Sequence, residues 1–227
     1  MALASALNMS GLDSAKPSSG FIAGRIYFAT DTSKLYYDNG TALVAYTFGG
    51  GGGGGAMALI ADTTVSGAAA ANIDFASIAG TYKHLRVVGQ ARGDTAANNV
   101  LVKLRMNADS TAAHYQWDIA EFYGGSTGNG SENGSDTAMS IGHACANTSP
   151  ANTPGVFAID IPNYASTVFN KVITGTYGYA SGGGAGGNLT GTAFGIWVST
   201  AAITELTFLP AAGNFIIGSR ISLYGIA

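Results

Sequence analysis

The amino-acid sequence predicts an all-β protein in which a jelly-roll-like β-sandwich follows a small N-terminal β-meander, and three observations support this class. About ten runs of alternating apolar and polar residues lie between Met57 and Ala227, separated by clusters of Gly, Asn, Ser and Pro. No run of about ten or more residues combines helix-forming residues with a period of 3.6. Residues 24–48 add three short strands with turn signals between them.

The first segment, residues 1–23, is mostly small and polar. Pro17 and Gly20 flank two serines and interrupt any helix. A segment of this composition cannot bury enough apolar surface to order itself. We therefore expect an extended arm that becomes ordered on a partner.

Residues 24–48 predict the β-meander. Asp38-Asn39-Gly40 is a hairpin signal, because Asn-Gly accepts the positive φ angles of a type I′ turn. Both faces of the strands carry apolar side chains, and so short a meander cannot bury both faces alone. We expect self-association or docking through a set of apolar residues: Ile26, Tyr27, Phe28, Leu35, Tyr36, Tyr37 and Leu43.

Seven consecutive glycines, Gly49–Gly55, begin a predicted linker over residues 49–56. Seven residues span at most about 25 Å when extended. Because glycine-rich chains behave as flexible coils, the meander and the sandwich are expected to be tethered but independently oriented.

The sandwich is predicted over residues 57–227. Its apolar runs cover 57–65, 83–91, 99–107, 113–122, 138–146, 155–162, 171–180, 191–200, 203–210 and 219–226. The segment 72–82 is expected to hold a short helical turn. Two long polar segments, 124–137 and 181–188, are expected to be loops, which either bind a ligand or form solvated tips.

Charge and composition exclude several classes of protein. Charged residues make up 10% of the chain, against about 25% in an average soluble domain. The net charge is −3, and the ten basic residues are scattered, so we expect no binding to nucleic acid, which requires clustered Lys and Arg. We also expect no membrane insertion and no secretory leader, because no stretch has about 18 apolar residues or a basic segment before an apolar one.

One cluster of carboxylate and aromatic side chains stands out, around Trp117 and Asp118. In a functional interpretation, the aromatic ring is a platform for a sugar and the carboxylate bonds its hydroxyl groups. In a structural interpretation, which we favour, Trp117 fills the core and Asp118 is solvated on the opposite face of the strand. With two asparagines of the polar segment that follows, the candidate ligand-binding residues are Trp117, Asp118, Glu121, Tyr123, Asn129 and Asn133.

Other motifs carry weaker signals. Cys145 is the only cysteine, so the chain can form no internal disulfide and no thiolate zinc site, and we expect a buried, inert thiol near His143. Arg92-Gly93-Asp94 spells an integrin-binding tripeptide, but Gly-Asp after a strand is ordinary turn chemistry. We expect no cofactor and no metal site, because the three histidines fall on different predicted strands.

The stretch "GRIYFATDTSKLYYDNGTAL", residues 24–43, resembles a short module in the N-terminal parts of tailed-bacteriophage virion proteins, chiefly tail fibres. Ala42 follows the Asn-Gly-Thr turn where that family often places a tryptophan. The matching residues are Gly24, Tyr27, Phe28, Thr30, Asp31, Leu35, Tyr36, Asp38, Gly40 and Thr41. Residues 82–92, 104–109 and 218–226 resemble the jelly-roll domains of phage fibres and spikes.

The resemblance implies a non-enzymatic structural protein of the virion, assembled in the host cytoplasm and exposed on the particle surface. It implies a homotrimer whose N-terminal arm docks on another virion protein, and a short tail fibre or receptor-binding protein whose sandwich attaches to a host-surface glycan. The alternative is a head fibre or decoration protein attached to the capsid. A polysaccharide depolymerase that uses Asp118 or Glu121 is a third possibility.

Overall fold

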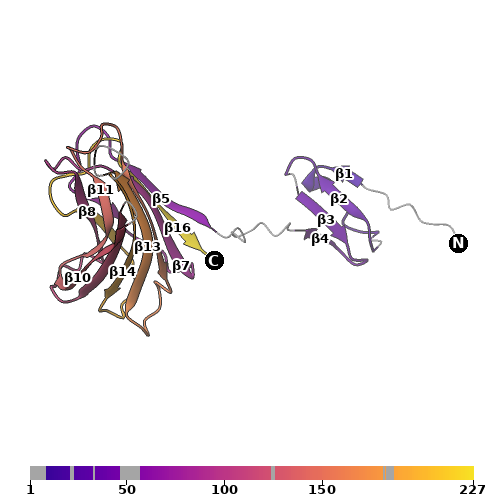
Figure 1. Cartoon of the computed structure of the whole chain (residues 1–227). Coiled ribbons are helices and arrows are strands. Elements are labelled where there is room, and N and C mark those ends of the chain that lie inside the picture. Colours follow the sequence, from indigo (N-terminus) through magenta and orange to yellow (C-terminus); the bar gives the residue numbers. More distant parts are fainter. Residues whose placement is uncertain are drawn as a thin grey trace. The chain divides into compact units, whose positions relative to one another are not determined.

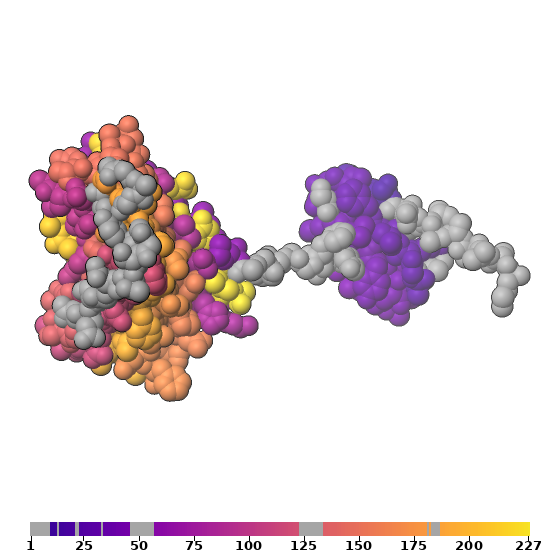
Figure 2. Space-filling model, viewed as in Figure 1, coloured from indigo at the N-terminus to yellow at the C-terminus, as the bar shows by residue number. Residues whose placement is uncertain are grey.

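The computed structural model describes residues 9–20, 23–32, 34–46, 57–123, 126–180, 182 and 187–227. The chain divides into two compact units, residues 1–54 and 55–227 (Figures 1 and 2). The predicted linker, 49–56, lies outside the described residues. Each unit is described below by itself.

The N-terminal unit is a four-stranded sheet in the order β1-β2-β3-β4 (Figure 1). Its strands are β1 (Met9–Gly11), β2 (Ile26–Ala29), β3 (Lys34–Asp38) and β4 (Leu43–Tyr46). The turn between β3 and β4 differs from the predicted type I′, because Gly40 adopts a φ of 90° but Asn39 does not have a positive φ. Instead, the Asn39 side-chain carbonyl accepts hydrogen bonds from the backbone N–H groups of Thr41 and Ala42, at 2.9 and 2.8 Å.

The expected extended arm is corrected for residues 9–16, which fold against the sheet. Strand β1 pairs in parallel with β2, and a 3₁₀ turn follows at Asp13–Ala15. The Tyr27 hydroxyl donates to the Leu12 carbonyl at 2.8 Å, and the Lys16 ammonium lies 4.9 Å from the centre of the Tyr36 ring. The arm is ordered by its own sheet, because the two tyrosine rings supply the apolar and hydrogen-bonding surface that it lacks.

The C-terminal unit is a sandwich of two antiparallel sheets, which confirms the predicted all-β class (Figure 1). The larger sheet has eight strands in the order β10-β9-β14-β13-β12-β7-β16-β5, and the smaller has four in the order β11-β8-β15-β6. The strands are β5 (Ala58–Thr64), β6 (Ile73–Phe75), β7 (His84–Ala91), β8 (Asn99–Met106), β9 (Tyr115–Tyr123), β10 (Ser126–Asp136), β11 (Met139–Cys145), β12 (Gly155–Pro162), β13 (Lys171–Ala180), β14 (Asn188–Trp197), β15 (Leu206–Pro210) and β16 (Arg220–Ile226).

Two strands of the sandwich appear where the sequence predicted none. Ile73–Phe75 forms β6 rather than a helical turn, pairs with β15 and buries Ile73 and Phe75. Ser126–Asp136 forms β10 rather than a loop, and pairs with β9 at the edge of the larger sheet. Its Gly, Ser and Asn residues carry no hydrophobic alternation, so only the hydrogen-bonding edge of β9 determines its strand conformation.

The core lies between the two sheets and follows the alternation of the strands. On β8, for example, Val100, Val102, Leu104 and Met106 are buried, while the residues between them are half-buried. Glycine provides space for an aromatic ring at Gly89, where a Cβ atom would collide with the ring of Phe157. The ring of Phe157 in turn stacks on Phe208 of the smaller sheet, with centroids 6.3 Å apart.

A polar network fixes the turn between β8 and β9 to the end of β14. One Asp109 carboxylate oxygen accepts a hydrogen bond from the indole of Trp197 at 2.7 Å and lies 2.8 Å from Nδ1 of His114. The hydroxyl of Tyr115 donates to the Asp109 backbone carbonyl at 2.8 Å. Burial disfavours the charged carboxylate, but hydrogen bonds from His114, Trp197 and Thr111 outweigh it and hold the pKa of Asp109 well below its usual range.

This network predicts an acid-sensitive contribution to the stability of the sandwich. A carboxyl group whose pKa is lowered by folding stabilises the protein above its unfolded pKa of about 3.9, and that contribution is lost as the pH falls further. Asp109→Asn should lower the free energy of unfolding by about 2 kcal/mol at pH 7, and by less as the pH falls below about 4. Urea unfolding monitored by tryptophan fluorescence measures this, because both tryptophans, Trp117 and Trp197, lie in the sandwich. A difference between variant and wild type that stays constant from pH 7 to pH 3 would contradict the assignment.

Candidate functional site

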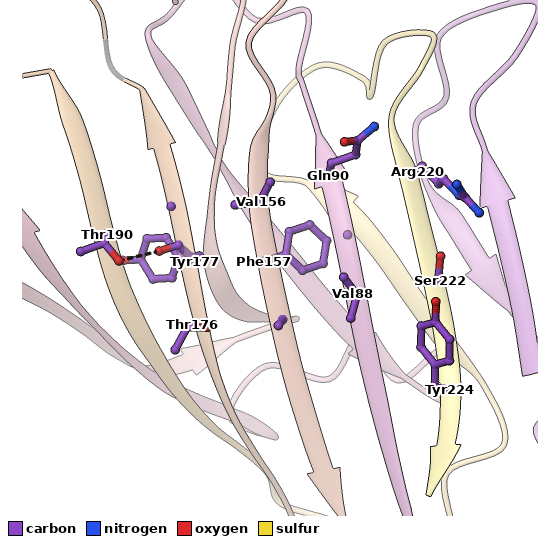
Figure 3. Close-up of a pocket in the computed structure, with 13 residues that line it drawn as sticks. Val88, Gln90, Val156, Phe157, Thr176, Tyr177, Thr190, Arg220, Ser222 and Tyr224 are labelled. Carbon is purple, nitrogen blue, oxygen red and sulfur yellow. Dashed lines mark hydrogen bonds between the residues drawn. The ribbon is translucent and has the colours of Figure 1, made fainter. Parts of the chain in front are cut away.

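A groove of about 620 Å³ lies on the outer face of the eight-stranded sheet, the face turned away from the smaller sheet (Figure 3). Five neighbouring strands contribute to it, from β16 through β7, β12 and β13 to β14. We call it the outer groove. No sequence motif predicts the outer groove, because its lining residues all lie on strands that are far apart in the chain.

Strand pairing determines which side chains line the outer groove. Val88 on β7 is paired with Ala158 on β12, and Gln90 on β7 is paired with Val156 on β12. Val88 and Val156 are 42% and 51% exposed, so the bottom of the groove presents apolar surface to solvent. Gly178, opposite Val156 on β13, has no side chain, which leaves the groove open at this point.

The β16 side of the outer groove is polar, and the positive charge of Arg220 on this side is neutralised by Asp62. The Arg220 guanidinium donates through Nε to both carboxylate oxygens of Asp62, at 2.8 and 3.1 Å. The Ser222 hydroxyl donates to the same carboxylate at 2.5 Å. These hydrogen bonds, the Arg220 one first, lower the pKa of the Asp62 carboxyl. Asp62 and Arg220 therefore both stay ionised at neutral pH, and the Asp62 carboxylate holds the side chains of Arg220 and Ser222 in place.

The six ligand-binding residues expected from the sequence do not form one site. Trp117 is buried in the core, as the favoured structural interpretation predicts, and offers no exposed platform for a sugar. Asp118 is exposed on the outer face of β9, whereas Glu121 points inward. The two carboxyl groups thus lie on opposite faces of the strand and do not form the pair that a glycosidase needs.

The remaining three predicted ligand residues are placed by the backbone alone. Strand pairing sets Asn129 opposite Glu121 and Asn133 opposite Trp117, and Tyr123 ends β9. The side chains of Tyr123, Asn129 and Asn133 lie outside the described part of the structure.

Glu121 instead belongs to a polar cluster between the sheets. Its Oε1 atom lies 2.7 Å from Nδ1 of His143 on β11 and accepts a hydrogen bond from the Tyr177 hydroxyl at 3.2 Å. Burial lowers the pKa of His143, and the neighbouring Glu121 carboxylate offsets part of this effect. Burial, and then Glu121, raise the pKa of Tyr177. Sequence reasoning missed the cluster because its members come from different sheets.

The lone cysteine is buried, as expected. The Cys145 thiol donates to the Ala180 carbonyl at 3.4 Å, while the ring of His143 is directed at Glu121. Within the described ranges, no three His, Cys, Asp or Glu side chains gather closely enough to hold a metal ion.

The side chains of Arg92 and Asp94, in the Arg92-Gly93-Asp94 tripeptide, form hydrogen bonds within the sandwich. The Arg92 guanidinium donates to the carbonyls of Pro150 and Thr153, both at 2.8 Å, and to that of Ser149 at 3.0 Å. The carboxylate of Asp94 accepts hydrogen bonds from the backbone and side-chain nitrogens of Asn214. The motif connects three loops of the fold, so its geometry explains these residues without an adhesion partner.

The N-terminal unit carries a second candidate surface. The seven residues expected to mediate association divide between the two faces of its sheet. Tyr27, Tyr36 and Leu43 form the unit's own small core. The opposite face, which we call the open face, presents Ile26, Phe28, Leu35, Tyr37 and Val44.

The comparisons with known proteins identify no relative. No family model, no curated protein and no solved structure matches the chain. None of the helical segments among the described residues is long and apolar enough to span a membrane.

The Arg92 contacts predict a structural role for this side chain. Arg92→Met should lower the free energy of unfolding of the sandwich by about 2–4 kcal/mol, because charge-assisted hydrogen bonds to several loop carbonyls are lost. Arg105→Met is the matched control, since Arg105 donates to one carbonyl, that of Thr137, at 3.2 Å, and should cost less than about 1 kcal/mol. Urea unfolding of both variants measures the difference, and equal effects would show that the loop contacts of Arg92 do not stabilise the fold.

Proposed function

We propose that the chain is a non-enzymatic structural protein of a tailed-phage virion. Its N-terminal unit associates with copies of itself, and its sandwich is presented on the particle surface to attach to the host. The proposal combines the resemblance of residues 24–43 to phage fibre modules with the open face of the same segment. The stoichiometry proposed, a homotrimer, comes from that resemblance.

The open face is the observation that carries the proposal. Ile26, Tyr37 and Val44 are paired in register across β2, β3 and β4 and are 40%, 44% and 36% exposed. Phe28, paired with Leu35, extends the same face and is 42% exposed. A continuous apolar surface of this kind is rare on a monomer and is typical of an interaction surface.

A second copy of the chain is the occupant that the open face fits best. The outward positions of β2, β3 and β4 in this register carry no charged residue, so identical faces meet without burying an unpaired charge. The opposite face of the sheet is contacted by residues 12–16 of the same chain, through Tyr27 and Tyr36. Burial of the exposed apolar area is worth about 25 cal/mol per Å², which favours association of copies.

Attachment to the host is assigned to the sandwich because it combines a rigid scaffold with exposed outer surface. Each strand of the eight-stranded sheet is hydrogen-bonded to its neighbours from β10 to β5, so its outer side chains are held by backbone ladders. The weakly charged composition suits a surface that is not meant to repel a neutral partner.

Association through the open face predicts the effect of polar substitutions there. The triple variant Ile26→Thr, Tyr37→Thr and Val44→Thr keeps residues that suit strands but removes most of the apolar surface, and it should be monomeric. Light scattering during size-exclusion chromatography of the full chain at micromolar concentration measures this, with the wild type expected as a trimer.

The matched control places three threonines on exposed apolar positions of the sandwich, Phe122, Phe194 and Val198. This variant should remain associated like the wild type. A wild-type chain that is monomeric while β2 and β3 are protected from hydrogen exchange would overturn the proposal.

A further inference from the structure

We propose that the outer groove is a binding site for a neutral saccharide chain, with the ring faces over Val88, Val156 and Ala158 and the hydroxyl groups bonded by Gln90, Thr176 and Tyr224 (Figure 3). The inference deepens the proposed attachment function and rests on it for the origin of the ligand. It places the site on β7, β12, β13 and β16 rather than on β9 and the segment after it.

The outer groove combines apolar and polar surface. A pyranose ring has apolar C–H faces and a rim of hydroxyl groups. Val88 and Val156 supply exposed apolar surface, and small residues, Ala158 and Gly178, leave room above the sheet for a ring. Tyr224 adds a half-buried aromatic side chain on the β16 side.

The outer groove presents side chains that can both donate and accept hydrogen bonds. The side chains of Gln90, Thr176 and Tyr224 make no hydrogen bond to other residues within the described part of the chain. An amide, an aliphatic hydroxyl and a phenol can each donate and accept. A sugar hydroxyl also does both, whereas a phosphate or a carboxylate only accepts, so the three groups match a ligand rich in hydroxyls.

The charged side chains at the outer groove are paired with opposite charges. Arg220 is neutralised by Asp62, and Arg86, next to Tyr224 in the sheet, lies 3.2 Å from Asp160. The groove and its border therefore present ion pairs rather than an uncompensated cation. This balance favours a neutral ligand over an acidic one.

The position of the groove argues against an extended peptide. A peptide that binds to a sheet by strand addition needs an open edge with unpaired backbone groups. The outer groove lies in the middle of the sheet, where β7 is paired with β12 on one side and with β16 on the other. Recognition must then come from side chains, which suits a ligand with many hydroxyl groups.

The test uses the full chain on an array of defined neutral oligosaccharides of glucose, galactose, mannose and N-acetylhexosamines, with uronic-acid oligosaccharides beside them. We expect binding to at least one neutral oligosaccharide, and titration calorimetry with that compound gives its affinity. Ala158→Phe should fill the groove and abolish measurable binding. Tyr224→Ala should weaken binding about tenfold, the value of one well-made contact.

Ala120→Phe is the matched control for Ala158→Phe. Ala120 is an outward alanine on β9 of the same sheet, opposite Thr192, and does not line the groove. This variant should bind like the wild type. Circular dichroism of each variant separates loss of the site from loss of the fold, and Gln90→Ala provides a second variant at an exposed position.

Three results would overturn the inference: no binding to any neutral oligosaccharide, a preference for the uronic acids, or unchanged affinity in Ala158→Phe. Light scattering and host-cell binding on the same samples separate this failure from that of the proposed function. If Ala158→Phe still associates and still binds cells, the attachment function stands and the groove is not its site. If the wild type is monomeric but binds an oligosaccharide through the groove, the groove stands and the assembly proposal fails.

Discussion

A β-sheet face that carries apolar side chains must be covered by another part of the chain or remain available to a partner. This constraint determines what each unit of the protein can do. In the sandwich, the inner faces of the two sheets cover each other and bury residues such as Leu104 and Phe208. In the N-terminal unit, residues 12–16 lie against one face, and the other face, with Phe28 and Tyr37, is exposed. The same alternation of side chains that forms a core in one unit therefore leaves an interaction surface in the other.

Polar groups in the sandwich follow the same constraint. Some that face inward are paired across the two sheets, as Glu121 is with His143, and Asp109 in the β8–β9 turn is paired with Trp197, because an unpaired polar group away from water costs stability. On the outer face, Asp62 holds Arg220, whereas the polar groups of Gln90, Thr176 and Tyr224 are available to solvent. Only the outward set is placed to meet a ligand.

Small residues have opposite roles on the two faces of the larger sheet. Gly89 points toward the core and makes room for the ring of Phe157, which ties the two sheets together. Ala158 and Gly178 lie on the outer face, where missing side-chain volume creates the groove. A rigid sheet can thus form a recess in its middle without a loop, and the recess stays in place because the backbone ladders on both sides hold it.

The sequence alone determined the all-β class and most of the strands, because alternation with period two is a local property of the chain. It also predicted that Trp117 lies in the core and that the meander is too small to bury the apolar residues on both of its faces. It could not identify β10, whose residues carry no pattern and whose conformation comes from pairing with β9. The groove, the Glu121–His143 contact and the contacts of Arg92 join residues far apart in the chain, so only the tertiary structure decided them. Strand order and register, which set such neighbours, are not encoded in any one segment.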